Sequence, residues 1–256
     1  MREIYRYVRL WKASNVSTCD LTESLSYQHP NWDIALRRRT RSCRLQPGRV
    51  RRSRDRRTIP NVSELLFRNV SDAERGRACE TLVSAFTNDP IERWMYPKLE
   101  QYLAHFPAFV AAFGGRAFWG QTAWCLGDFA AVALWFPPGI EPDGDAIATV
   151  LSQTVSPELH DELFAVLGEM EEAHPTYPHW YLPWFGVDKA QQGKGLGGQL
   201  MDKCLQVVDE SHLSVYLETP NPATIGFYKR HGFVVTGEAR GPTCPTMTFM
   251  TRGARQ

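Results

Sequence analysis

The stretch Gln192-Gly193-Lys194-Gly195-Leu196-Gly197-Gly198 decides how the rest of this chain is interpreted. An apolar, aromatic-rich run over 179–187 leads into it, and an amphipathic helical pattern follows it. A strand, a glycine turn and a helix N-terminus form an anion site, because glycines let the backbone approach closely and several N–H groups point at the anion. The helix dipole adds about 0.3–1 kcal/mol for each nearby charge. The stretch therefore predicts a phosphate or pyrophosphate site at residues 192–198.

Two other interpretations fit the same seven residues. Gly193, Gly195 and Gly198 match the dinucleotide fingerprint G-x-G-x-x-G, with Glu218 near the position of a ribose-binding acid. In that pattern the glycines follow the strand almost directly, whereas residues 188–191 intervene here, and only 38 residues remain after Glu218 for further βα units. A glycine turn that binds nothing is the other alternative, although it needs fewer small residues than this stretch holds.

A second motif, residues 221–233, favours one of these interpretations. As local structure it predicts a short helix: Asn221 is a good N-cap, Pro222 a good first helical residue, and Gly232 a good stop. The ordered combination of Q-x-x-G-x-G, a helix, a strand and N-x₆-Y-x₃-G-F resembles the GNAT superfamily of acetyl-CoA-dependent N-acetyltransferases. The resemblance covers about residues 62–252.

The resemblance implies a fold, a co-substrate and a set of binding residues. The fold is mixed α/β, with a mostly antiparallel central sheet that splays between its fourth and fifth strands and is flanked by helices. The first motif carries the pyrophosphate of coenzyme A, and the second lies beside the pantetheine arm and the thioester. The implied acetyl-CoA-binding residues are Phe185, Gly186, Val187, Gln192, Gly193, Lys194, Gly195, Leu196, Gly197, Gly198, Asn221 and Tyr228.

Two details refine the resemblance. Thr224 stands where the family commonly has alanine. Several short stretches are similar to the puromycin N-acetyltransferase branch of the superfamily, which places the subfamily without identifying the acceptor. Those stretches are 186–187, 192–197, 217–219, 227–228 and 241–242.

Acetyl transfer from a thioester to an amine needs a base and an acid. The attacking amine must be neutral, although a lysine-type amine has a pKa of about 10.4. Tyr228 is the predicted acid for the departing thiolate, because a phenol of pKa about 10 stays protonated at neutral pH. The strand 179–187 lacks the Glu that relatives often carry there, so Glu218 is the predicted base, with His174 and His179 as substitutes. Glu218 could act through a water molecule, or it could bind the acceptor amine instead. The structural alternatives are a buried core tyrosine and a solvated strand-end carboxylate.

Aromatic residues are candidates for the acceptor site by analogy with the family. Trp184 and Phe185 lie on the central strand, and Trp94, Tyr96 and Trp135 lie where an aromatic acceptor pocket is expected. Packing in the core is the alternative for Trp184 and Phe185. Residues 61–256 hold 14 Lys and Arg against 23 Asp and Glu, a net −9, which favours a cationic acceptor such as an amine.

The N-terminal segment differs sharply from the rest of the chain. Residues 1–60 hold 15 Lys and Arg against 5 Asp and Glu, a net +10, and residues 37–57 alone contain 11 arginines without an apolar pattern. We therefore expect a disordered extension over 1–61 and one acetyltransferase domain over 62–256. The extension fits a nucleic-acid-binding tail, a transit peptide, or translated sequence upstream of a true start at Val62.

Composition excludes several classes. The six cysteines lie at least 24 residues apart, with no zinc spacing, so we expect no metal and a reducing, cytoplasmic setting. The longest apolar run, 129–136, is 8 residues, against about 20 for a membrane span.

The predicted function is acetyl transfer to the primary amine of a small molecule, an antibiotic or xenobiotic among the options, through a ternary complex, by a monomer or homodimer. The alternatives are a non-catalytic acetyl-CoA-binding module with a nucleic-acid-binding tail, and a protein-lysine acetyltransferase.

The periodicity predicts strands at 65–70, 122–126, 128–136, 179–187, 213–217, 233–238 and 246–251. It predicts helices at 71–88, 99–113, within 145–172, at 196–211 and at 221–231. In the helix at 99–113 one apolar face is expected to hold Leu103, Phe106, Phe109, Val110 and Phe113. In the helix at 196–211 the residues expected inward are Leu200, Met201, Cys204, Leu205 and Val208.

Overall fold

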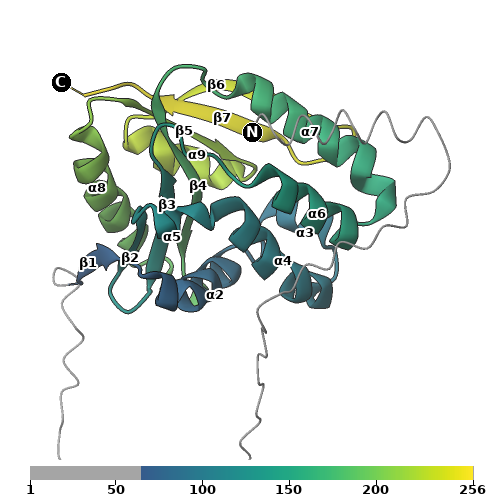
Figure 1. The fold of residues 1–256 in the computed structure, drawn as a ribbon, viewed down its shortest axis with the longest axis horizontal. Coiled ribbons are helices and arrows are strands. Elements are labelled where there is room, and N and C mark those ends of the chain that lie inside the picture. Colours follow the sequence, from purple (N-terminus) through teal and green to yellow (C-terminus); the bar gives the residue numbers. More distant parts are fainter. Residues whose placement is uncertain (1–64, 256) are drawn as a thin grey trace, which may run out of the picture.

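A computed structural model describes residues 65–255 of the chain (Figure 1). A seven-stranded sheet with the order β1-β2-β3-β4-β5-β7-β6 forms its centre. The strands are β1 (Phe67–Asn69), β2 (Ala123–Leu126), β3 (Ala131–Phe136), β4 (His179–Val187), β5 (Ser214–Thr219), β6 (Val234–Ala239) and β7 (Met247–Arg252). The α-helices are α2 (Arg75–Ala85), α3 (Pro90–Met95), α4 (Leu99–Gly114), α5 (Arg116–Trp119), α6 (Gly144–Thr154), α7 (His160–Ala173), α8 (Leu196–Asp209) and α9 (Pro222–Arg230). Three 3₁₀ turns, η2 (Asp72–Glu74), η3 (Pro157–Leu159) and η4 (Lys189–Gln191), complete the set.

The sheet is mostly antiparallel and splits at its middle. Among the strand pairs within 67–252, only β4 and β5 run parallel. Their pairing stops at Tyr181 and Tyr216, although β4 continues to Val187 and β5 to Thr219. Pro183 lies in β4 beside the register shift that separates Leu134 from Phe136 on β3, as expected for a proline in a strand interior. The expected fold class is confirmed, and a doubly wound dinucleotide fold is excluded.

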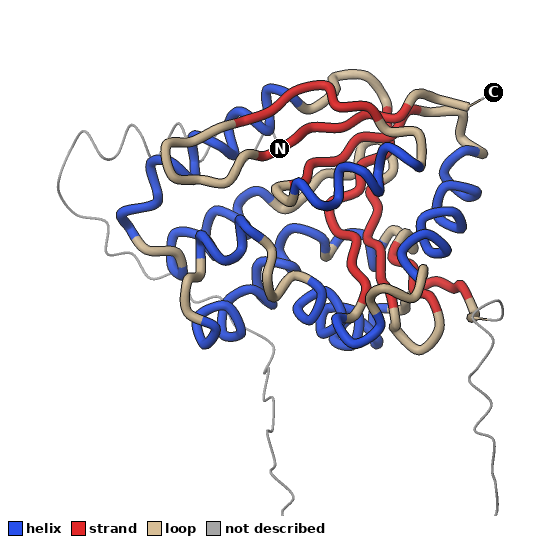
Figure 2. Tube along the Cα trace, turned by 180° about the vertical axis from the view of Figure 1, so that it is seen from behind, coloured by secondary structure: helices blue, strands red, loops and turns tan. Residues whose placement is uncertain are grey.

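Helices cover both faces of the sheet, as the view from behind in Figure 2 also shows. Alternate residues of β3 enter the two halves of the core, because successive side chains of a strand point to opposite faces. Val132, Leu134 and Phe136 pack with α2, α4, α6 and α7, whereas Ala133 and Trp135 pack with α8 and α9. Burial on both faces explains why 131–136 is a continuous apolar run.

The expected elements are found with small shifts in their ends. The strand at 179–187 is confirmed over its full length, and all five residues expected inward on α8 are buried: Leu200, Met201, Cys204, Leu205 and Val208. The helix after Ser71 begins as the 3₁₀ turn η2, in which Glu74 accepts a hydrogen bond from the Ser71 N–H. Helices α3 and α5 were not expected, because six and four residues are too short for a periodic signal.

One packing expectation is wrong. Leu103 was expected on the buried face of α4, but it is 53% exposed, and Tyr102 is buried instead. Tyr102 stacks on Phe106 and donates a hydrogen bond to the Val83 carbonyl on α2, which satisfies its hydroxyl. The expectations for residues 1–61 lie outside the described residues.

Candidate active site

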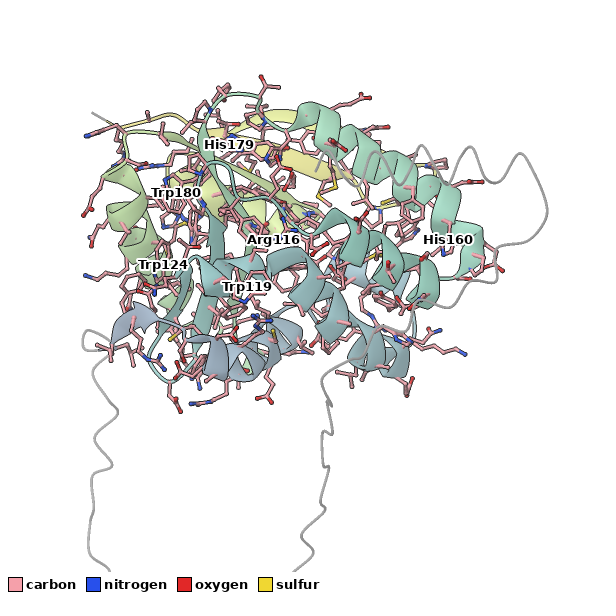
Figure 3. The ribbon with its side chains drawn as sticks, viewed as in Figure 1. Arg116, Trp119, Trp124, His160, His179 and Trp180 are labelled. Atoms are coloured by element: carbon pink, nitrogen blue, oxygen red, sulfur yellow. The ribbon has the colours of Figure 1, made fainter. Side chains whose placement is uncertain are left out.

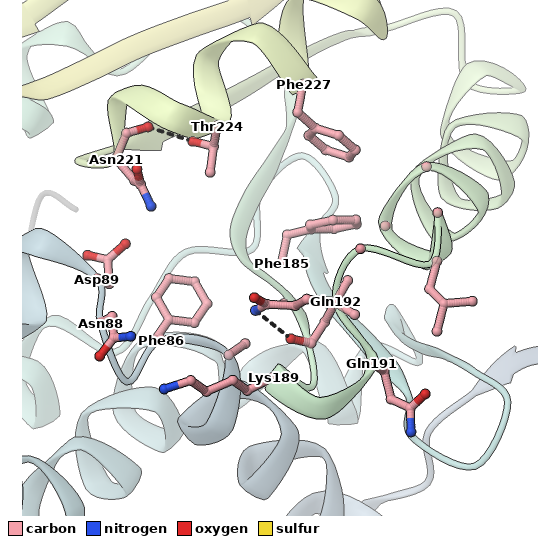
Figure 4. A pocket seen from close by; sticks show the side chains of 18 of the residues that line it. Phe86, Asn88, Asp89, Phe185, Lys189, Gln191, Gln192, Asn221, Thr224 and Phe227 are labelled. Carbon is pink, nitrogen blue, oxygen red and sulfur yellow. Dashed lines mark hydrogen bonds between the residues drawn. The ribbon is translucent and has the colours of Figure 1, made fainter.

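A cavity of about 560 Å³ opens beside the glycine stretch (Figure 4). It lies between the carboxyl end of β4, the N-terminus of α8, one side of α9 and the loop that follows α2. We call it the glycine-loop cavity. Eleven of the expected coenzyme-binding residues line it: Phe185, Gly186, Val187, Gln192, Gly193, Gly195, Leu196, Gly197, Gly198, Asn221 and Tyr228. The tertiary structure thus brings the two sequence motifs to one cavity.

The backbone of the glycine stretch requires its glycines. Gly193 and Gly195 both have a φ of 77°, a left-handed conformation that L side chains rarely adopt. Open space lies in front of both positions, so the bare backbone borders the cavity. Gly195 is the N-cap of α8, and the first N–H groups of this 14-residue helix have no partner within the helix. This geometry fits an anion such as the pyrophosphate of coenzyme A.

The cationic side chains at this cavity are not the one expected from the sequence, Lys194, but Lys189 and Arg230. Lys194 does not line it; the Lys194 Nζ donates hydrogen bonds to the Ala190 carbonyl and the Gln191 side chain instead. Lys189 and Arg230, from the two ends of the site, line the cavity. Gln192 Nε2 donates to the Val187 carbonyl at 3.1 Å and so ties the glycine turn back to β4 (Figure 4).

Helix α9 is fixed at its N-terminus by a compact hydrogen-bond network. The Asn221 side chain accepts from the Ala223 N–H at 3.1 Å, which confirms it as the N-cap. The Thr224 hydroxyl lies 2.8 Å from both the Asn221 carbonyl and the Thr219 hydroxyl. Thr224, the departure from the family pattern, therefore joins α9 to the end of β5 and lines the cavity.

A second cavity of about 120 Å³ lies deeper, and we call it the apolar cavity. Its walls come from α3, α4, α6, α7 and both splayed strands, and most of its lining is apolar or aromatic. Trp184, expected at the acceptor site, is in this wall. Its ring meets those of Phe86, Phe106, Phe109 and Phe113 edge to face, at centroid distances of 5.1–5.8 Å. Such contacts hold the wall in one arrangement.

The two cavities meet. Five residues line both of them: Phe86, Asp89, Phe185, Thr224 and Tyr228. Tyr228 is 8% exposed, and burial raises the pKa of its hydroxyl, with a smaller contribution from the Asp89 carboxylate. A hydroxyl with a raised pKa stays protonated at neutral pH and can donate a proton where the cavities join.

Buried carboxylates lie on the α3 side of this junction. Asp89 is 8% exposed and Glu92 is 2% exposed. Asp89 is the N-cap of α3 and accepts from the Ile91 N–H, yet burial raises the pKa of its carboxyl to about 6. Burial, together with the Asp89 charge, raises the pKa of Glu92 well above its ordinary value. The sequence indicated neither residue, because Asp-Pro before a helix is a common N-cap signal.

Glu218, His174 and His179 form a row of side chains on the side of the junction away from α3. The Glu218 side chain is 4% exposed, so it is not a solvated strand-end carboxylate. Its Oε1 lies 3.7 Å from Nδ1 of His174, and neither atom has a hydrogen-bond partner. Nε2 of His174 lies 2.9 Å from Nε2 of His179, whose Nδ1 lies 2.7 Å from the Tyr177 carbonyl. Burial lowers the pKa of His179, which favours its neutral form.

Hydrogen bonding fixes the tautomers of these two histidines. A carbonyl accepts only, so Nδ1 of His179 carries the proton and its Nε2 accepts. Nε2 of His174 must then donate, which leaves a lone pair on Nδ1 of His174. Two acceptors, Nδ1 of His174 and Oε1 of Glu218, therefore face one another, and the gap between them can hold one proton.

Three expected acceptor-site residues lie elsewhere. Trp135 is fully buried beneath α8, where it packs against Trp124 and Trp180, both labelled in Figure 3. Tyr96 is buried, and its hydroxyl is hydrogen-bonded to that of Thr154. Trp94 donates to the Thr243 hydroxyl at 3.0 Å, outside the lining of either cavity. Loop position alone did not predict which way these side chains point.

A glycine-rich anion site that joins an apolar pocket at a buried tyrosine, between splayed parallel strands, fits an acyl-CoA-dependent transferase. Comparison with known families agrees: the model of the acetyltransferase (GNAT) family matches residues 96–233. The chain belongs to this family, which uses acetyl-CoA as co-substrate, and the expectation of an N-acetyltransferase is confirmed at this level.

Individual relatives are distant. An uncharacterized N-acetyltransferase from Schizosaccharomyces pombe is 25% identical over 184 residues, which are 62% of this chain and 70% of that protein. A Corynebacterium glutamicum structure described as histone acetyltransferase HPA2 and related acetyltransferase has a TM-score of 0.55 and 19% identity, over 75% of this chain and 97% of the other. The polyamine N-acetyltransferase of Drosophila melanogaster has a TM-score of 0.54 and 15% identity, over 74% of this chain and 100% of the other. These structural likenesses show the fold.

Between residues 65 and 255 there is no helix with the length and apolar character that a bilayer crossing requires. In the same range, no three His, Cys, Asp or Glu side chains gather in an arrangement that would hold a metal ion.

Proposed function

We propose that this protein transfers the acetyl group of acetyl-CoA directly to the primary amine of a small, largely apolar molecule. The observation that carries the proposal is the junction of the two cavities at Tyr228. Two substrates bound on either side of one buried hydroxyl can react without a covalent enzyme intermediate, and holding them in line contributes about 7–11 kcal/mol of the barrier.

The glycine-loop cavity would hold the co-substrate. The N–H groups at the start of α8 would bind the pyrophosphate, and Lys189 and Arg230 would add charge at the phosphates. Phe185, Gly186 and Val187 would border the pantetheine arm along the open edge of β4, with Asn221 across from them on α9. When bound, the co-substrate supplies a thioester whose thiolate departs as the amide forms.

The residues around the junction would donate and accept the protons that the reaction transfers. Tyr228 gives its proton to the departing thiolate, and its buried setting keeps that proton in place until then. Glu218 takes the proton that the amine releases. His174 and His179 are positioned to share and pass on that proton, because Nδ1 of His174 faces Glu218 with a free lone pair.

The decisive experiment compares Tyr228→Phe with the unaltered protein. We expect the turnover number to fall about 10²–10⁴-fold, since that is the usual contribution of a general acid, while acetyl-CoA binding stays unchanged. Acetyl-CoA stabilisation in a thermal melt measures binding, and thiol release with a panel of primary amines, puromycin included, measures turnover. A Tyr228→Phe protein that turns over normally would refute the assignment of the acid. Acetyl-CoA binding without turnover of any amine or protein lysine would favour the non-catalytic alternative.

Finer parts of the proposal follow from the sequence alone. We propose that the chain is related to the puromycin N-acetyltransferase branch and that residues 62–256 carry the activity. We further propose a cytoplasmic location and a monomeric or homodimeric state. A nucleic-acid interaction would belong to residues 1–61. A salt-dependent affinity for DNA that disappears when residues 1–61 are deleted would support that interaction.

A further inference from the structure

Two acidic side chains are buried against one another in the acceptor region. Glu92 lines the apolar cavity but not the glycine-loop cavity, whereas Asp89 lines both. Asp89 is the N-cap of α3 and Glu92 is the third residue of this helix, and the charge of Asp89 acts on the Glu92 carboxyl. Burial disfavours the charged form of such a pair, and a bound cation would offset that cost.

Among the residues that the structure describes, no cation pairs with them. Within residues 65–255, Arg side chains form ion pairs with six other carboxylates, and His174 and His231 lie beside two more, but no Lys, Arg or His side chain is paired with Asp89 or Glu92. Glu92 is 2% exposed, and its Oε2 has no hydrogen-bond partner. A carboxylate oxygen that is buried, unpartnered and in the wall of a cavity points to a ligand that supplies the missing donor.

The size and walls of the cavity limit that ligand. Its volume of about 120 Å³ is close to the roughly 150 Å³ of an engineered cavity that holds a benzene ring. Its lining away from the carboxylates is mostly apolar or aromatic and includes Phe109, Leu163 and Met170. An aliphatic chain of a few carbons or a single ring therefore fits inside.

The reacting amine cannot be the cation that pairs with Asp89 and Glu92, because it must be neutral when it attacks. Glu218 is available to take its proton. A cation at Glu92 would also lie away from the coenzyme cavity, which Glu92 does not line. We propose, resting on the proposed function, that the preferred acceptors carry a second cationic nitrogen, separated from the reacting amine by a short apolar spacer, and that Glu92 with Asp89 holds this second nitrogen.

The test uses a matched pair of ligands on the full chain saturated with coenzyme A. Hexylamine and hexamethylenediamine differ only in the second nitrogen, and calorimetry gives the Kd of each. We expect the diamine to bind about 10-fold to 100-fold more tightly, which is the usual range for a hydrogen bond to a charged group. Glu92→Gln should remove this preference and leave the Kd of hexylamine within about twofold. Glu100→Gln, a change at an exposed position of α4, is the control and should preserve it.

Each outcome bears on one proposal. Equal affinities of the unaltered protein for the two amines, or a preference that persists in Glu92→Gln, would overturn the inference. Retained coenzyme A binding shows that a variant is folded, and Asp89→Asn, which keeps an N-cap acceptor, provides a second variant that should weaken the preference. Because Kd is measured without turnover, a diamine preference without acetyl transfer would refute the proposed function alone. Transfer to hexylamine without a diamine preference would refute the inference alone.

Discussion

Gly186 near the end of β4 is a position where one added methyl group should disturb the site. A Cβ at this position would lie 2.7 Å from the Ala85 Cβ and 3.0 Å from the Leu82 Cδ2. Ordinary contacts begin at 3.4 Å, so α2 would have to move away from the sheet by about 0.7 Å. Phe86, which follows α2 and lines both cavities, lies 3.5 Å from the same point.

We expect Gly186→Ala to lower the free energy of unfolding by about 1–3 kcal/mol, the usual effect of overfilling a close-packed core. The clash is with a helix and with a Cβ that has no rotamer to change, so relief requires movement of the backbone. Urea unfolding followed by circular dichroism measures the loss. A rise in the KM for acetyl-CoA should accompany it, because the moved Phe86 borders the glycine-loop cavity.

Gly76→Ala is the matched control. Gly76 lies on α2, and nothing lies within 4 Å of the position of its missing Cβ. Alanine in a helix is favoured over glycine by about 0.5–1 kcal/mol, so this variant should be more stable than the unaltered protein. If Gly186→Ala unfolded at the same urea concentration as the unaltered protein, the packing of α2 on β4 would be looser than described, and the reasoning would fail.

Four further changes test other parts of the structure. Gly195→Ala, at a φ of 77°, should cost about 1–2 kcal/mol and raise the KM for acetyl-CoA in steady-state assays. Asp89→Asn should stabilise the fold by up to about 3 kcal/mol at pH 8, but not near pH 4, as measured by urea titration. Burial raises the pKa of the Asp89 carboxyl in the folded protein from 3.8 to about 6. The cost of burying the charged carboxylate therefore appears only as the pH rises through that range. His174→Gln should lower kcat about tenfold or more with acetyl-CoA binding unchanged, and normal turnover would exclude His174 from the proton path. Glu162→Ala should destabilise the fold by about 1–3 kcal/mol in thermal melts, because this carboxylate accepts hydrogen bonds from two main-chain N–H groups and a hydroxyl of the loop between β6 and β7.

Local sequence signals were sufficient for the strands, the longer helices and the glycine site. The positive φ values at Gly193 and Gly195 and the N-cap at Asn221 are short-range properties, because they depend on a few neighbouring residues. Strand alternation and helical periodicity likewise located β4 and α8 and the residues that they bury. The order and spacing of the two motifs then indicated the family.

Only the tertiary structure decided what surrounds the acceptor. Asp89 and Glu92 are ordinary residues of a short helix in the sequence, and they become unusual because α3 is buried beside the splayed strands. The facing lone pairs of Glu218 and His174 arise because a loop and β5 meet across a separation of 44 residues, which no local pattern records. The position of Trp135 was also beyond local prediction, since β3 is buried on both faces and only the fold decides which face Trp135 occupies. Burial and long-range contact set the electrostatics of this site, and both exist only in the folded chain.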